Sequence, residues 1–298
     1  MVPENNYFGH DLILFLYSKS RFRFPIFGYL NHAWFTEKNF SLKKTKFRFA
    51  PIFLINDALV KKSRENGILN CSSIGSPFLY LLKFLWPRND YPMGNGTLIL
   101  PTIHDEFREE KLIETIQQVM RTCEPPYTIR LKNFSNELEM IDLNNDFWSK
   151  INCRIDILSL RSEPNFLIKL AFEIAKHSTV VGNEIQTGLI YAAAMGKKIK
   201  LVGPRVNWQA DRIKYKEESD FLIQKYPELL KNGLVGSQSI SFGRKELGWN
   251  NLLSPKDLRK SLGWNNPLKI ILSFLIHYKN KYEHGKQIFQ GKYDNING

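Results

Sequence analysis

Two histidines lie where loops follow short apolar runs, and each is a candidate general acid or base. His32 stands just before Trp34 in the first such loop, and His104 precedes Asp105 and Glu106 in the second. Histidine titrates near neutral pH and is the commonest acid–base residue in enzymes. We take His32 as the stronger candidate. The alternatives are an ordinary loop histidine or one that orients a phosphate, and for His104 the capping region of the next helix.

A turn at Gly182 has residue types that suit an anion. Gly182 and Asn183 tolerate positive φ, and a helix is expected to begin near Glu184. The free N–H groups and positive dipole end of a helix favour phosphate. Thr187 adds a hydroxyl, and Gly188 lets a ligand approach the backbone. The turn therefore predicts a phosphate site, with a helix start that binds nothing as the alternative.

Three charged residues could complete such a site. Arg130 and Lys132 stand at the end of an expected strand, where charge-assisted hydrogen bonds could neutralise a diphosphate. Plain surface cations are the alternative. Glu184 could accept a hydrogen bond from a ribose or sugar hydroxyl, or could simply favour the helix N-terminus electrostatically.

Several familiar chemistries have no motif in this chain. GxGxxG, GxxxxGK[ST], HExxH and GxSxG are all absent, which argues against a P-loop NTPase, a zinc protease and an α/β-hydrolase, and weakly against an NAD dehydrogenase. No convincing Asp-x-Asp metal clamp is present, so neither a metal nor another cofactor is expected. The three cysteines, Cys71, Cys123 and Cys153, are widely spaced, which favours a reducing compartment over a disulfide framework.

The composition favours an anionic partner. The 298 residues suggest about two domains, and 43% hydrophobic residues are enough for full cores. Lys and Arg number 42 against 29 Asp and Glu, a net charge of +13. Nucleic acid, an anionic membrane surface and a phosphorylated small molecule all fit that excess. We do not expect nucleic-acid binding, because the cations are scattered and no RRM, KH or helix-turn-helix signature is present.

Strands and helices are expected to alternate through the second part of the chain, which predicts a parallel sheet. A helix near 166–175 carries Leu167, Leu170, Ala171 and Ile174 on one face. In chain order the other expected elements are a strand at 97–101, a helix at 109–123, strands at 127–131, 155–160 and 178–181, a helix from 184, and a strand at 198–202. Ligands bind outside the carboxyl ends of such strands, where the turn at Gly182 should lie.

The segment 87–96 is the expected linker, since it concentrates Pro, Gly, Asn and Asp between apolar patterns. It divides the chain into a domain at 1–90 and another at 91–298. The first domain is expected to hold a strand or short helix at 12–17, strands at 21–30, 49–55 and 68–74, and a helix at 58–66 capped by Asp57. After residue 204 we expect helices at 214–225, from 255 and from 267, and a turn and strand at 234–242.

Three short motifs resemble bacterial surface-polysaccharide glycosyltransferases with the GT-B fold. The segment 179–199 is similar to their donor-site segment, in which a Thr/Asn/Gly turn precedes a helix reading Gly, Tyr-Ala and Gly-Lys-Pro; Lys198 stands here in place of the proline. The loop at 31–34 is similar to their His-Gly-Trp loop, with Ala33 for the glycine. The segment 73–80 is similar to their Ile-Gly-Ala-Pro loop.

The resemblance covers about two thirds of the chain and implies two Rossmann-like domains with parallel sheets that face a cleft. It implies a nucleotide-sugar donor on the second domain, an acceptor on the first, metal-independent transfer, and a last helix that packs back toward the first domain. Asn183, Glu184, Thr187 and Gly188 would then bind the donor diphosphate and ribose, and His32 would be the base. The acceptor would be a capsule or lipopolysaccharide glycan, or a lipid-linked one.

Two other functions remain open from the sequence. One is the transfer of a polyol phosphate from a CDP-linked donor, and the other is a catalytically silent sugar- or nucleotide-binding partner in polysaccharide assembly. The chain is expected in the cytoplasm, because no apolar stretch approaches the ~20 residues that span a bilayer. The basic excess is compatible with peripheral contact at the inner face of an anionic membrane.

Overall fold

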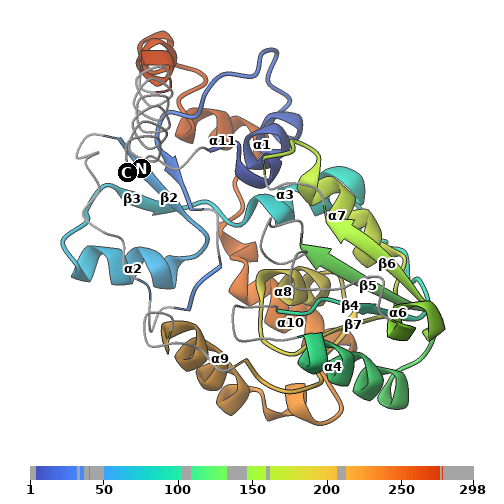
Figure 1. The fold of residues 1–298 in the computed structure, drawn as a ribbon. Coiled ribbons are helices and arrows are strands. Elements are labelled where there is room, and N and C mark those ends of the chain that lie inside the picture. Colours follow the sequence, from blue (N-terminus) through green and yellow to red (C-terminus); the bar gives the residue numbers. More distant parts are fainter. Residues whose placement is uncertain are drawn as a thin grey trace, which may run out of the picture.

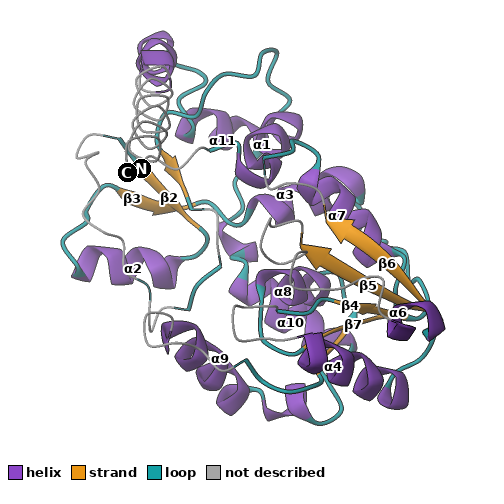
Figure 2. Ribbon diagram, in the orientation of Figure 1, coloured by secondary structure: helices purple, strands orange, loops and turns teal. Residues whose placement is uncertain are grey.

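The computed structural model describes residues 5–31, 34–36, 40, 50–102, 109–132, 146–158, 162–206, 213–275 and 277. Its strands form two separate parallel sheets (Figure 2). The predicted fold class is confirmed in that the chain is α/β with two parallel sheets. The GT-B-like placement of the two units about a cleft stays a prediction. The prediction that these units meet at residues 87–96 stays a prediction.

The first sheet has the order β1-β2-β3, and each neighbouring pair is parallel. The elements of this part are α1 (His10–Ser18), β1 (Tyr29–Leu30), β2 (Ile52–Leu54), α2 (Asp57–Glu65), β3 (Cys71–Ser73) and α3 (Pro77–Leu85). Asn56, rather than Asp57, caps α2 by accepting a hydrogen bond from the Leu59 N–H. Ser76 caps α3, which places Pro77 at the first helical position.

The second sheet has the order β6-β5-β4-β7-β8, which corresponds to the order 3-2-1-4-5 of a doubly wound Rossmann-type sheet. Helix α4 packs its buried apolar side against one face of this sheet. The elements are β4 (Thr97–Ile99), α4 (Glu109–Thr122), β5 (Tyr127–Lys132), α6 (Asp146–Lys150), β6 (Cys153–Leu158), α7 (Phe166–Ala175), β7 (Thr179–Gly182), α8 (Thr187–Ala194) and β8 (Lys198–Leu201).

The C-terminal third returns from the second sheet to the first (Figure 1). It holds α9 (Ile213–Lys225), α10 (Gly236–Glu246), α11 (Pro255–Ser261) and a helical stretch at 267–275. Helix α10 lies against α8, where a Cβ on Gly243 would come within 2.2 Å of the Ala194 nitrogen. The segment after α10 then reaches the first sheet's loops, since the Ser76 N–H donates to the Leu247 carbonyl at 2.9 Å.

Arg244 contacts both stretches of chain that connect the units. The first connection is the segment between α3 and β4, and the second is the segment after α10. Its Nη2 donates to Asn89 Oδ1 at 3.3 Å and to the Tyr91 hydroxyl at 3.5 Å, both in the first connection. Its guanidinium carbon also lies 3.9 Å from the centre of the Trp249 ring, in the second connection. The two connections are therefore side by side.

Besides the cap of α2, three local expectations were wrong and one helix was not expected. Of the strand expected at 21–30 only Tyr29–Leu30 forms, because Pro25 lacks an N–H and Gly28 has a φ of 140°. The segment expected as turn and strand at 234–242 is helix α10, since packing on α8 outweighs the weak helix propensity of its Gly and Ser residues. Helix α8 begins at Thr187 and not at Glu184. Helix α3 was missed, although its Ser-Pro start is a helix signal.

The buried side chain of Lys197 holds the segment between α3 and β4 against the second unit. Lys197 is buried, and its Nζ donates to the carbonyls of Pro92 at 2.5 Å, Met93 at 2.9 Å and Ala175 at 3.1 Å. Burial lowers the pKa of this ammonium from 10.5 to about 8.

This lowered pKa predicts how stability depends on pH. Between pH 8 and 10.5 the unfolded chain holds a proton on Lys197 that the folded chain has lost, so the native protein should gain stability as the pH rises. Relative to Lys197→Met, the gain should be on the order of 3 kcal/mol across that window. Urea unfolding of both proteins at several pH values measures it, and parallel pH profiles would contradict it.

Candidate functional site

The candidate site is the carboxyl edge of the second sheet between β4 and β7. The strand order reverses there, because β4 begins the series β4-β5-β6 and β7 begins the return through β8. Ligands of open parallel sheets bind at such a switch point, since the loops on either side leave in opposite directions. Residues 100–102 after β4 and the turn between β7 and α8 form the two walls.

Asn183 joins these walls. Its Oδ1 accepts from the Thr102 N–H at 2.7 Å, and its Nδ2 donates to the Thr102 carbonyl at 3.2 Å. Gln186 adds a bond from Nε2 to the Leu100 carbonyl at 2.5 Å. Asn183 is completely buried, so these bonds satisfy its amide within the protein. The structure thus shows Asn183 holding the crevice in shape; its predicted contact with a diphosphate stays a prediction.

Two glycines bring α8 and the β7 end close to β4. A Cβ on Gly182 would come within 2.9 Å of the Leu100 carbonyl oxygen, and one on Gly188 within 2.8 Å of Leu100 Cδ1. Larger residues at these positions would push the turn away from β4. The glycines therefore permit the close helix–strand packing that a nucleotide-binding turn needs.

The N-terminus of α8 has no side-chain cap. Gln186 occupies the capping position in extended conformation, and its side chain makes no capping bond because it reaches Leu100 instead. In the first turn of α8 the Leu189 N–H donates to the Gln186 carbonyl at 3.0 Å. The N–H groups of Thr187 and Gly188 are left without an intrahelical partner. Thr187 and Gly188 are half-buried, so a ligand can reach the backbone of this turn.

Thr102 contributes an unused hydroxyl to the same place. The residue is 8% exposed, and its Oγ1 has no hydrogen-bond partner within the described part of the chain. A buried polar atom without a partner costs about 1–3 kcal/mol. Such an atom beside an uncapped helix end is an observation that points to a ligand.

Glu184 forms a buried cluster behind the turn. Its Oε1 accepts from Arg205 Nε at 2.5 Å and from the Val206 N–H at 3.0 Å, and its Oε2 accepts from the Ser219 hydroxyl at 2.7 Å. The carboxylate therefore ties the β7 turn to the loop after β8 and to α9. Its predicted bond to a ribose hydroxyl stays a prediction.

The cations near the crevice are paired with carboxylates. Arg205 is about one-third exposed, and its Nη2 lies 3.3 Å from Asp220 Oδ1. Arg130 is buried inside the sheet, opposite Asp156 in register, with Nη1 3.3 Å from Asp156 Oδ2. Burial lowers the pKa of Arg130, and Asp156 opposes that shift.

Arg130 lies on β5, which β4 separates from β7, so roughly 10 Å divide it from the turn in the direction of strand pairing. Lys132 ends β5, and its side chain is outside the described part. Both stay predictions as diphosphate ligands. The sequence analysis did not identify Thr102 or Arg205 as site residues, because only the strand order places them at the crevice. The turn residues Gly203 and Pro204, directly before Arg205, were the available signal of a loop there.

Both candidate histidines lie outside the described residues, but the flanks of His32 are placed. Asn31 and Trp34 are buried, and Trp34 Nε1 donates to Glu246 Oε2 at 3.3 Å. Glu246 ends α10, the helix that packs on α8. The loop that carries His32 is thus attached to the helix behind the candidate site. For His104 the described neighbour is Thr102, two residues earlier.

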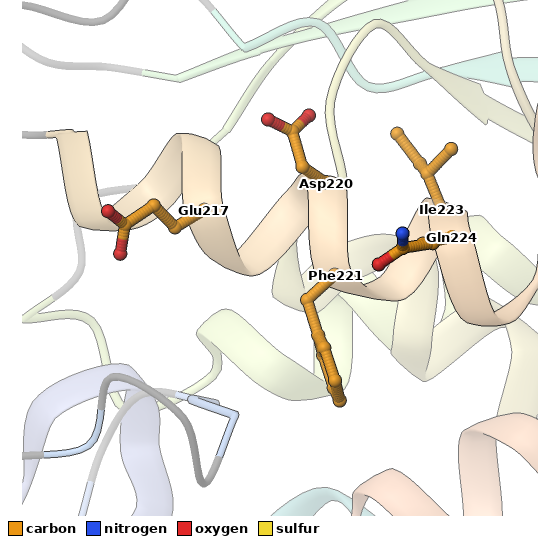
Figure 3. Close-up of a pocket in the computed structure, with 5 residues that line it drawn as sticks. All are labelled: Glu217, Asp220, Phe221, Ile223 and Gln224. Atoms are coloured by element: carbon orange, nitrogen blue, oxygen red, sulfur yellow. The ribbon is translucent and has the colours of Figure 1, made fainter.

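A surface pocket of about 470 Å³ lies on α9 and is lined by Glu217, Asp220, Phe221, Ile223 and Gln224. Figure 3 shows Asp220 and Phe221 pointing to opposite sides of this helix. Its two carboxylates disfavour phosphate, so we do not place the diphosphate of a donor there. Among the residues that the structure describes, no three His, Cys, Asp or Glu side chains gather as a metal site.

Comparison with known proteins gives structural likenesses and no sequence match. No protein-family model and no curated protein sequence matches the chain. Among solved structures, UDP-GlcNAc 2-epimerase from Neisseria meningitidis bound to UDP-GlcNAc is similar at a TM-score of 0.34 and 10% identity, over 76% of this chain. The chain spans 61% of that protein's length. A likeness at this distance identifies no function.

Proposed function

We propose that the chain is a glycosyltransferase that moves a sugar from a nucleotide-sugar donor to a capsule or lipopolysaccharide acceptor without a metal. One observation carries the proposal: the unpartnered hydroxyl of Thr102 lies at the switch point that also holds the uncapped start of α8. Anions bind at such helix starts. The motif resemblance at 179–199 assigns that position to a donor diphosphate.

The chemistry requires two kinds of group. The bond between the anomeric carbon and the diphosphate oxygen breaks, the nucleoside diphosphate leaves with the electron pair, and the acceptor oxygen forms the new bond as it loses its proton. The N–H groups of Thr187 and Gly188 at the start of α8 would stabilise the leaving diphosphate. The imidazole of His32 would take the acceptor proton.

The test is a donor screen with two readouts. The purified chain is incubated with UDP-, GDP-, CDP- and CMP-linked sugars, and nucleotide release is measured together with thermal stability in the presence of the free nucleotides. A nucleotide at 100 times its Kd should raise Tm by roughly 5 °C. No release and no shift with any nucleotide would contradict the proposal.

Thr102→Val should separate ligand binding from stability. Valine keeps the volume of threonine and removes a hydroxyl that bonds nothing described, so the free energy of unfolding should stay the same or rise by about 1 kcal/mol. Nucleotide affinity should fall about tenfold, measured by titration calorimetry.

Thr128→Val is the matched control. The Thr128 hydroxyl is buried and lies 3.0 Å from His177 Nε2, away from the crevice. This variant should lose about 1 kcal/mol of stability and keep its nucleotide affinity. Equal affinities in the native protein and Thr102→Val would remove Thr102 from the site.

The two alternatives give different results in the same screen. A polyol-phosphate transferase would respond to CDP-linked donors and release CMP in place of a nucleoside diphosphate. A silent binding partner would show a thermal shift with no turnover. No observation of the structure favours either over sugar transfer.

A further inference from the structure

The helical stretch at 267–275 carries an apolar stripe that faces away from the protein. Leu268, Ile271, Leu272 and Leu275 recur at i, i+3, i+4 and i+7, which is one face of a helix. The exposed fractions are 70% for Leu268, 56% for Ile271, 46% for Leu272 and 61% for Leu275. Ser273, which points elsewhere, is buried. An amphipathic helix normally buries its apolar face, so this arrangement requires a partner.

Exposed basic residues lie at the same end of the molecule as the stripe. The loop at 19–24 follows α1, and both of its ends are attached beside the helix: the Ser18 carbonyl accepts from Arg259, and the Pro25 carbonyl accepts from Trp264 Nε1 at 3.3 Å. Figure 1 shows α1, α11 and the red helix at the same end of the molecule. The exposed cations of this end are Lys19, Arg21, Arg23, Lys256 and Lys260.

The loop adds an aromatic side chain to the same surface. Phe22 is 56% exposed, and the Arg21 guanidinium lies 5.2 Å from the centre of its ring. Lys269, on the helix itself, lies 5.7 Å from the ring of Phe27. Of these cations Arg23 is paired, with Asp11 at 2.6 Å. Exposed aromatic and aliphatic groups beside lysine and arginine are the composition of surfaces that lie in the interface of a bilayer.

We propose that this end of the molecule docks on an anionic lipid bilayer, with the stripe at 268–275 and Phe22 among the headgroups and the cations of this end against the lipid phosphates. The positive charge of this surface favours a bilayer over a second copy of this chain. A second copy would place its own cations against those of the first, and each copy has a net charge of +13. The proposal does not depend on the identity of the donor.

The experiment is co-sedimentation of the full chain with lipid vesicles. Binding is expected to vesicles of phosphatidylcholine mixed with phosphatidylglycerol and not to phosphatidylcholine alone, and it should weaken as the salt concentration rises. Leu268→Glu combined with Leu272→Glu should abolish binding. Lys256→Glu and Lys260→Glu should each lower vesicle affinity about fivefold or more.

Leu69→Glu is the matched control, since Leu69 is 77% exposed and belongs to the turn before β3. It should bind vesicles as the native chain does, with an unchanged Tm. Equal binding to neutral vesicles, or full binding by the double-glutamate variant, would overturn the proposal. A second result would also overturn it: a dimer seen by light scattering that the double-glutamate variant abolishes, together with no binding of the native chain to anionic vesicles.

Discussion

His32→Ala should lower turnover about 10²–10⁴-fold and leave nucleotide affinity unchanged. A general base contributes this much because it removes the acceptor proton as the new bond forms. The diphosphate would be held on the other unit, by α8, so its binding does not need the imidazole. Single-turnover kinetics measure the first quantity and calorimetry with the free nucleotide measures the second.

The pH profile gives this prediction its control. In the native protein kcat/KM should rise with pH through the pKa of the free base, and His32→Ala should lose that limb. His104→Ala is the companion variant, since it tests the second histidine in the same assay. Unchanged turnover in His32→Ala would contradict its role as the base, and a loss confined to His104→Ala would move that role to His104.

Glu184→Gln should lower the free energy of unfolding by about 3 kcal/mol. The variant keeps the shape of the side chain but replaces a buried carboxylate, which accepts a charge-assisted hydrogen bond from Arg205 Nε, with a neutral amide. The amide also replaces one carboxylate oxygen with an NH₂ donor. In the native protein these two oxygens accept from the Val206 N–H and from the Ser219 hydroxyl. Urea unfolding measures the difference.

Asp220→Asn controls for the removal of a carboxylate from the same arginine. Asp220 is largely exposed, so water screens its pair with Arg205 and the cost should stay below about 0.5 kcal/mol. A Glu184→Gln variant with native stability but without nucleotide affinity would contradict the structural role and support the ribose contact expected from the sequence.

The second sheet was predicted well because its signals are local. Gly or Pro marks an end of most of its strands, as Gly96 does before β4 and Gly203 after β8, and the expected helix at 109–123 matches α4 to one residue. The Ser254 cap with Pro255 at the first helical position is also confirmed, since Ser254 accepts from the Asp257 N–H. Such signals depend on neighbours in sequence, so no tertiary information is needed to read them.

The first sheet and α10 were harder because distant residues decide them. The strand β1 has only two residues, and its partner lies across the chain at Ile52 and Phe53. Helix α10 depends on the close approach of Gly243 to α8, which no local propensity reveals. In the site, the turn residues were found by type, whereas the bonds of Asn183 and Glu184 to Thr102 and Arg205 follow from strand order.

The position of Arg244 has a consequence for how the two sheets can move. Because this side chain contacts both Asn89 and Trp249, the outgoing and returning chains cross at one place. The two connections are not the whole attachment, because the rings of Phe78 on α3 and Tyr191 on α8 stack with their centroids 4.0 Å apart, so relative motion of the two sheets would have to disrupt a shared apolar core. Any opening between the two sheets would therefore also have to separate Trp34 Nε1 from Glu246 Oε2, which lie 3.3 Å apart, because that bond joins the first unit to the helix that packs on α8.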